Sequence, residues 1–338
     1  MLLSIPALKA VRNLYSESEL SILVPSRISR IAESLSYIDN VFIFNIEYGG
    51  IVPFNKIFRN LKVLLSLRNK HVDIAVNMRT LVSKTSARKI KLLLDVIKPK
   101  MKVGRDTEGR GYFFDVRIPE TDIGTKHETE YNIETVKALG AEVIDTTIGF
   151  DIDEASTDTV RNILEREGIS EETTLIGMHP GGRPSRRWPV ESFVKATENI
   201  DKAISCVFVV TGGRDEIDLA EELVNKSCAK VINLAGRLSI KQLGAVIKRC
   251  NLFISNDTGP MHISAVLGTP LVAVLGPGDI VHYDPRKISK QVIVLYEKAD
   301  CSPCTKTRCD SMECLKKISP EEVAEAALGS INHERNID

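Results

Sequence analysis

A short run of polar and glycine residues, from Asn256 to His262, offers the clearest chemistry in this chain of 338 residues. It follows the apolar segment 252–255, which predicts a buried strand, and it precedes apolar residues at helical spacing that end at Gly268. A second apolar segment, 271–275, predicts the next strand of a parallel sheet. The turn therefore lies at the carboxyl end of a strand, where such sheets bind ligands.

The residue types in this turn suit an anionic ligand. Asp257 and Thr258 stand at the start of the expected helix, and Gly259 lets a ligand approach the backbone closely. Free N–H groups at a helix start bind phosphate, and His262 lies one turn further on, where it can add a donor. Each residue taken alone has an ordinary alternative, as an N-cap or a packed imidazole. Their combination on one turn favours a binding site.

A second loop with phosphate-binding character follows the expected strand 174–178. Gly181 and Gly182 come soon after the strand, and basic residues that include Arg186 follow them. Glycine N–H groups and a guanidinium group together suit a phosphate. The loop is not a P-loop, because the Gly-Lys-Ser/Thr ending is absent. We expect Trp188, the single tryptophan, to pack this loop down and not to contact a ligand.

The charge of the chain is balanced overall but unevenly distributed. Residues 1–150 hold 22 basic and 17 acidic residues, and the remainder holds 23 and 28, so the two parts carry +5 and −5. Between Lys56 and Arg105, 14 basic residues stand against only two acids, a net charge of +12. A solvated helix face is the ordinary explanation, and an anionic lipid headgroup or phosphorylated sugar acceptor fits as well. Nucleic acid is not expected, because no nucleic-acid motif or aromatic interleaving accompanies the charge.

Alternating strand and helix patterns predict two doubly wound α/β domains. We expect an N-terminal domain over 1–150, a second domain over 157–318, and a terminal helix and tail over 319–338, with a polar linker before the second domain. Hydrophobic residues make up 43% of the chain, which is enough for two cores. No apolar run approaches the ~18 residues of a spanning helix, and the start lacks the pattern of a secretory signal.

Four of the seven cysteines form a C-x2-C-x4-C-x4-C cluster: Cys301, Cys304, Cys309 and Cys314. Four thiols within so short a segment can bind zinc or an iron–sulfur cluster. The spacing is not a standard one and no histidine lies near, so we assign no metal ligand.

The run Asp257-Thr258-Gly259-Pro260-Met261-His262, followed by Leu267-Gly268-Thr269-Pro270 and Gly276-Pro277, resembles the signature of the family 9 glycosyltransferases, the ADP-heptose:lipopolysaccharide heptosyltransferases. A weaker resemblance extends over nearly the whole chain. It implies a GT-B fold, in which two Rossmann-like domains face a cleft. The second domain would bind the nucleotide sugar, and the basic first domain would hold the acceptor.

The resemblance also assigns roles to residues of the second domain. Arg186 corresponds to the residue that holds the donor diphosphate, with Gly181 and Gly182 in its loop. Glu216, with Asp215 as a neighbouring candidate, corresponds to the carboxylate that binds the ribose, although an N-cap is the ordinary role of Asp215. The turn that contains Leu238 corresponds to the one that contacts adenine.

Asp257 would orient donor hydroxyls or the loop itself, and His262 would help to stabilise the leaving ADP. In the N-terminal domain, His127 opens a helix that the family places beside the cleft, so it either faces the acceptor or is an ordinary surface histidine.

The start of the chain departs from the family pattern. Residues Met1 to Leu8 correspond to the segment that follows an apolar strand and a Gly-Asp pair in the family, and that Asp is the family's proposed general base. We therefore expect the central strand of the first domain and the base to precede Met1. Our hypothesis is that the start was assigned too late or that the gene is a remnant.

The sequence predicts inverting transfer of a heptose or related sugar from ADP-heptose to a lipopolysaccharide core acceptor, without a metal or other cofactor. The resemblance implies a cytoplasmic protein that is peripheral on the inner membrane through its basic domain. Two alternatives stay open. A nucleotide-sugar 2-epimerase would use the same fold, and a binding remnant would keep the nucleotide site without transferring sugar.

Overall fold

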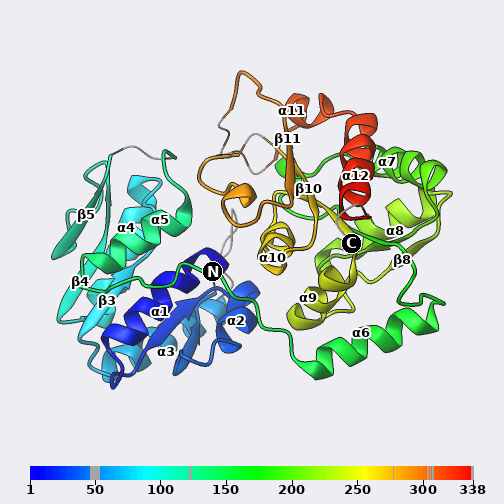
Figure 1. The fold of residues 1–338 in the computed structure, drawn as a ribbon. Helices are drawn as coiled ribbons and strands as arrows, with labels where there is room; N and C mark the ends of the chain where they lie inside the picture. Colours follow the sequence, from blue (N-terminus) through cyan, green and yellow to red (C-terminus); the bar gives the residue numbers. More distant parts are fainter. Residues whose placement is uncertain are drawn as a thin grey trace. The chain divides into compact units, whose positions relative to one another are not determined.

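The computed structural model describes residues 1–45, 54–121, 124–276, 278–302, 304, 306 and 308–335. Pro277, one residue of the family-like run, lies outside the described residues. The chain forms two compact units, Met1–Ile148 (unit 1) and Gly149–Asp338 (unit 2), which are coloured blue to green and green to red in Figure 1. Among the described residues, no helix combines the length and the apolar composition needed to cross a bilayer.

Unit 2 is built on one parallel sheet. Its six strands are β6 (Leu175–His179), β7 (Val207–Val210), β8 (Val231–Asn233), β9 (Leu252–Asn256), β10 (Leu271–Leu275) and β11 (Val292–Tyr296). They lie in the order β11-β10-β9-β6-β7-β8. This is the doubly wound order, in which the direction of winding reverses between the first and fourth strands, here β6 and β9. Ligands bind at the carboxyl ends of strands at such a reversal.

Helices cover both faces of this sheet (Figure 1). The helices of unit 2 are α6 (Glu154–Arg166), α7 (Val190–Ala203), α8 (Ile217–Lys226), α9 (Ile240–Arg249), α10 (Gly259–Leu267), α11 (Glu313–Lys316) and α12 (Pro320–Arg335). One core joins α7, α8 and α12 to strand residues such as Ile176 and Phe208, and a second joins α6 and α9 to Leu175 and Val209. Neighbouring residues of one strand thus point to opposite cores, which explains why these strands are apolar throughout.

Unit 1 also alternates strands and helices. Its elements are α1 (Ile5–Leu14), β1 (Ser21–Val24), α2 (Ser26–Glu33), β2 (Asn40–Ile43), α3 (Phe54–Asn69), β3 (Ile74–Asn77), α4 (Lys84–Ile97), β4 (Met101–Thr107), β5 (Val116–Glu120) and α5 (Glu128–Lys137). The described strands form two parallel sheets, β1-β2 and β3-β4-β5, where the sequence predicted one. That a further strand belongs to this unit stays a prediction.

The sequence missed two strands, β5 and β11. Both lie at a sheet edge, next to β4 and β10 respectively. β5 reads Val-Arg-Ile-Pro-Glu, and its proline and charged residues are tolerated only because an edge strand pairs on one side. The prediction was incomplete here because pairing with β4 and β10, and not local pattern, makes these segments strands.

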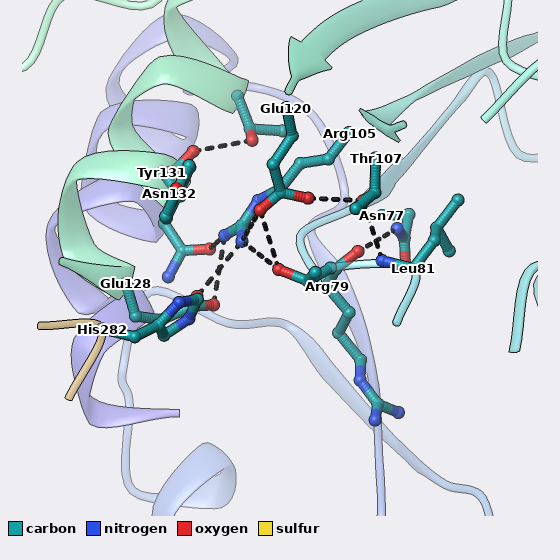
Figure 2. Close-up of polar contacts among 12 residues, drawn as sticks. Asn77, Arg79, Leu81, Arg105, Thr107, Glu120, Glu128, Tyr131, Asn132 and His282 are labelled. Carbon is teal, nitrogen blue, oxygen red and sulfur yellow. Dashed lines mark hydrogen bonds and ion pairs between the residues drawn. The ribbon is translucent and has the colours of Figure 1, made fainter. Parts of the chain in front are cut away.

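A buried arginine joins the elements of unit 1. Arg105, on β4, is fully buried, and Figure 2 shows it enclosed by Glu120, Glu128 and Asn132. Its guanidinium donates to both carboxylate oxygens of Glu128 at 3.1 Å and to Asn132 Oδ1 at 2.6 Å. Glu120 Oε1 lies 3.6 Å from Arg105 Nη1 and also accepts from Thr80. The cluster ties the ends of β4 and β5 to the start of α5.

Removing this arginine leaves two carboxylates without their cation. We expect Arg105→Met to lower the free energy of unfolding of unit 1 by about 3–5 kcal/mol, the usual effect of breaking a buried ion pair. Urea denaturation followed by far-UV circular dichroism measures the change. Fluorescence of Trp188, which belongs to unit 2, reports on the other unit in the same titration. Arg88→Ala, at an exposed position of α4, is the control, with a change below about 0.5 kcal/mol. Equal midpoints for wild type and Arg105→Met would contradict the role given to the cluster.

Candidate functional site

A guanidinium and a carboxylate meet at the point where the sheet of unit 2 reverses. Arg186 ends a short 3-10 turn (Pro184–Arg186) after β6, and Asp257 directly follows β9, the neighbouring strand. Arg186 Nη1 donates to Asp257 Oδ2, and the two side chains keep only 17% and 11% of their surface exposed. The two loops that the sequence predicted as phosphate-binding are therefore brought together at the carboxyl ends of β6 and β9.

At three glycines around this pair, other groups occupy the space of a side chain, and at Gly182 the backbone conformation also favours glycine. A Cβ on Gly182 would lie 2.5 Å from Thr258 Cγ2, and the residue has a φ of +117°. A Cβ on Gly181 would lie 2.3 Å from Glu216 Oε1. A Cβ on Gly278 would lie 3.0 Å from Asp257 Oδ2 and 3.2 Å from the guanidinium carbon of Arg186. Sequence reasoning missed Gly278, although its place after β10 was a signal.

Glu216 lies beside the same loop and braces it. Its carboxylate accepts from the N–H of Gly182 at 2.6 Å and from the N–H of Gly213 at 2.8 Å. Arg187 Nη2 lies 3.7 Å from Glu216 Oε1. The structure thus gives Glu216 a role that the sequence did not predict, since it ties the loop after β6 to the turn after β7. The N–H of Gly182, expected to face a ligand, is directed to this carboxylate.

Electrostatics keep Glu216 ionised. Burial raises its pKa, but the charge of His179 when that ring is protonated, the two N–H donors and Arg187 together lower it by more, so the pKa lies below its usual value. His179 is buried, and a hydrogen bond of 3.2 Å joins its Nδ1 to the hydroxyl oxygen of Thr211. Burial lowers the pKa of His179 and the Glu216 charge only partly offsets this, so the ring is neutral near pH 7.

Asn256, the last residue of β9, fixes the two loops relative to each other. It is fully buried and uses both ends of its side-chain amide. Its Nδ2 donates to the carbonyl oxygens of Pro180 at 2.8 Å and Gly181 at 3.2 Å, and its Oδ1 accepts from the N–H of Trp188 at 3.1 Å. The loop that carries Arg186 is therefore held at both ends by one residue adjacent to Asp257. Its signal in the sequence was a polar residue at the end of an apolar strand.

Helix α10 starts at this site. Thr258 is its N-cap residue, but its hydroxyl donates to the carbonyl of Asn256 at 3.2 Å and does not cap the helix. Gly259 is exposed at the first helical position. His262 is half-buried one turn further, and its ring lies 6.4 Å from that of Tyr283. The helix start, with its partial positive charge, lies next to Asp257 and accordingly offers N–H groups to an anion.

The turn after β8, which the resemblance assigns to adenine, makes fewer polar contacts than the loops around Arg186 and Asp257. Gly236 adopts a φ of +72°, and its N–H donates to the carbonyl of Gly212, in the turn after β7, at 2.9 Å. Leu238 is partly exposed and packs against the core between α6 and α9. It thus presents an apolar surface at the same edge of the sheet as Glu216.

The cysteine-containing segment supports the Arg186 loop. Ser185 Oγ donates to the carbonyl of Lys306 at 2.7 Å, and Trp188 Nε1 donates to the carbonyl of Ile318 at 3.1 Å. Trp188 is buried, as predicted, and packs against Phe193. The four clustered cysteines are free thiols, and within the described residues no group of three or more metal-ligating side chains comes together.

In unit 1, His127 caps a helix. It is buried, with 4% of its surface exposed, so the alternative of a surface histidine is wrong. Its Nδ1 accepts from the N–H of Thr129 at 3.4 Å at the start of α5. It therefore stands one residue before Glu128 of the Arg105 cluster.

The brace formed by Glu216 predicts a pH-dependent stability. An amide in its place can accept only one of the two N–H groups, so we expect Glu216→Gln to lower the free energy of unfolding by about 1–3 kcal/mol at neutral pH. Because the folded pKa is depressed, the stabilisation by the carboxylate is present above the unfolded pKa of about 4.3 and is lost as the pH falls through the folded pKa. The difference in the free energy of unfolding between Glu216→Gln and wild type should accordingly become smaller in acid.

Urea denaturation followed by Trp188 fluorescence over a series of pH values tests this. Glu221→Gln, at an exposed position on α8, is the matched control. If variant and wild type have equal free energies of unfolding at neutral pH, or if their difference grows in acid, Glu216 does not brace the loop.

Comparison with known proteins places the chain in a family. The model of glycosyltransferase family 9 (heptosyltransferase) matches residues 60–315. Lipooligosaccharide heptosyltransferase 2 of Campylobacter jejuni is 27% identical over 301 residues, which cover 83% of this chain and 87% of that protein.

Two solved structures share the fold over nearly the whole chain. A family 9 glycosyl transferase from Veillonella parvula has a TM-score of 0.76 at 24% identity, covering 98% of this chain and 93% of that one. The ADP-heptose lipopolysaccharide heptosyltransferase II of Escherichia coli has a TM-score of 0.72 at 19% identity, covering 99% and 96%. These similarities confirm the predicted GT-B fold class. Since the family model spans most of the chain, including Arg186 and Asp257, this protein belongs to glycosyltransferase family 9 and is a glycosyltransferase.

Proposed function

We propose that this protein transfers a heptose, with inversion, from ADP-heptose to a sugar of a lipopolysaccharide core. The names of its relatives support the substrate class, since the proteins of Campylobacter jejuni and Escherichia coli are heptosyltransferases. The observation that carries the proposal is the Arg186–Asp257 pair, held at the reversal of the sheet beside the start of α10. A nucleotide diphosphate finds there a cation and helix N–H groups in one place.

The donor half of the reaction follows from this arrangement. Attack by an acceptor hydroxyl on the anomeric carbon forms the glycosidic bond with loss of the hydroxyl proton and breaks the bond to the diphosphate, so negative charge develops on the departing ADP. Arg186, the N–H groups at the start of α10 and His262 would stabilise that charge. Asp257 holds Arg186 in place and offers its other oxygen to a donor hydroxyl. Because these fixed cationic and dipolar groups balance the charge, the proposal needs no metal cofactor.

The nucleoside half of the donor would lie along the same edge of the sheet. Glu216 uses its oxygens to accept two N–H groups, and its remaining lone pairs can accept from the ribose hydroxyls. Leu238 would contact the adenine, and the N–H groups of the turn around it would supply polar contacts. We further propose that the enzyme works at the cytoplasmic face of the inner membrane, as the resemblance to the family implies.

Arg186 provides the direct test. We expect Arg186→Ala to weaken ADP binding by about 10- to 100-fold, since a charge-assisted hydrogen bond contributes about 1.5–3 kcal/mol. Isothermal titration calorimetry with ADP measures the effect. Arg161→Ala, which removes the same side chain from the exposed surface of α6, is the matched control. Unchanged affinity in Arg186→Ala would remove the phosphate role from this loop.

The reaction itself is tested by supplying donor and acceptor separately. Wild-type protein with ADP-heptose and heptose-free lipopolysaccharide core should release ADP and yield a core enlarged by one heptose, both measured by mass spectrometry. With donor alone, neither product should form beyond slow hydrolysis. An altered donor sugar without ADP release would instead indicate an epimerase. Tight ADP binding with no product in either mixture would indicate a protein that only binds the nucleotide sugar.

A further inference from the structure

The segment that follows β10 lies next to the candidate site of unit 2. We call residues 278–284 the β10 loop. It leaves the sheet at the carboxyl end of β10, which pairs with β9. Its first residue, Gly278, packs closely on the site, since a Cβ there would lie 3.0 Å from Asp257 Oδ2 and 3.2 Å from the guanidinium carbon of Arg186. The β10 loop therefore begins directly beside the Arg186–Asp257 pair.

The β10 loop holds a carboxylate, that of Asp279, in a defined position. The N–H of Tyr283 donates to the carbonyl of Asp279 at 3.3 Å, and the N–H of His282 donates to Asp279 Oδ1 at 3.0 Å, so these residues form one compact turn. Asp279 Oδ2 lies 3.9 Å from His282 Nδ1, which is too far for a hydrogen bond, and the side chain is 30% exposed. One oxygen of Asp279 thus holds the turn, and the other can accept from a ligand hydroxyl.

Tyr283 adds an aromatic surface to the loop. Its ring lies 4.4 Å from the ring of the buried His282 and 6.4 Å from that of His262, one turn inside α10, and 36% of the residue is exposed. The next residue, Asp284, is buried and accepts from Arg286 Nε and Nη2 at 2.9 Å, which fixes the end of the loop. The loop therefore presents a carboxylate and an aromatic ring near the start of α10 on a backbone that is held at both ends.

The order of the strands decides which part of a nucleotide sugar would reach this loop. In the proposed function, the nucleoside lies at Glu216 and Leu238, after β7 and β8, and the diphosphate lies at Arg186, between β6 and β9. From β8 the sheet continues in one direction through β7, β6 and β9 to β10. The sugar is bonded to the end of the diphosphate away from the nucleoside, so it extends past β9 toward the β10 loop.

We propose that Asp279 and Tyr283 form the site for the transferred sugar of the donor. Asp279 Oδ2 accepts from sugar hydroxyls in charge-assisted hydrogen bonds, and the ring of Tyr283 covers an apolar C–H surface of the sugar. A phosphate is disfavoured at this position, because the carboxylate of Asp279 repels it. This proposal rests on the proposed function and deepens it, since it assigns the residues that select the sugar.

Isothermal titration calorimetry with ADP and with ADP-heptose, without acceptor, separates contacts to the sugar from contacts to the nucleotide. Asp279→Asn keeps an oxygen for the N–H of His282 and replaces the other oxygen by an NH2 group, which cannot accept. We expect this variant to bind ADP-heptose about 10-fold or more weakly than wild type. It should bind ADP at least as tightly, because removing a carboxylate does not weaken a phosphate contact. Asp201→Asn, at an exposed position of α7, is the matched control and should bind both ligands as wild type does.

Tyr283→Ser is a second variant, which removes the apolar ring and should also weaken binding of ADP-heptose more than binding of ADP. Unchanged affinity of Asp279→Asn for ADP-heptose would overturn the proposal, as would equal losses for the two ligands in both variants. Wild-type protein that binds neither ligand would refute the proposed function, and the sugar site with it. Wild-type protein that binds both ligands, with variants that do not distinguish them, would refute the sugar site alone.

Discussion

The site in unit 2 depends on the need to neutralise a partly buried cation. Arg186 stands on a loop that leaves the sheet at β6, and Asp257, at the end of the neighbouring β9, balances its charge. Desolvated charges are costly unless they are paired, so the pairing fixes the position of the loop as much as it fixes the side chain. Two strand ends lie close together here. This leaves little space for a side chain at Gly182 and Gly278, and it lets Asn256 form hydrogen bonds to both ends of the loop.

The same constraint links the site to the rest of unit 2. Ser185 and Trp188, on either side of the arginine, are hydrogen-bonded to the carbonyls of Lys306 and Ile318 in the segment before α12. Glu216 binds the loop from the opposite side through the N–H of Gly182. A guanidinium held in this way pays little conformational entropy when it binds a phosphate, which is the advantage of preorganised groups in catalysis.

Unit 1 also contains a buried arginine paired with carboxylates, but this arginine has a structural role. Arg105 is fully buried and is paired with Glu120 and Glu128, so its charge is neutralised inside unit 1 (Figure 2). Other basic residues of this unit lie on its surface, among them residues of α3 and α4 beside exposed apolar side chains such as Phe58. Arg105 therefore joins elements in the interior of the unit. The lysine and arginine residues on the surface give the unit the positive charge that it presents to partners.

The sequence alone predicted strands β6, β9 and β10 of unit 2 and the helix α10 between the last two, because apolar runs bounded by glycine, proline and asparagine leave few alternatives. It also determined that Arg186 and Asp257 follow strands of one parallel sheet, and the family-like run around Asp257 identified the family. Tertiary structure decided what local pattern does not encode. Edge strands β5 and β11 exist because they pair with β4 and β10. Glu216 is a brace, and Asn256 a link between loops, because the order of the strands brings together residues that are far apart in the chain. The exposure of Phe58, Leu61 and Leu65 on α3 likewise followed only from the packing, because a helical pattern shows which residues share a side and not which side the fold covers.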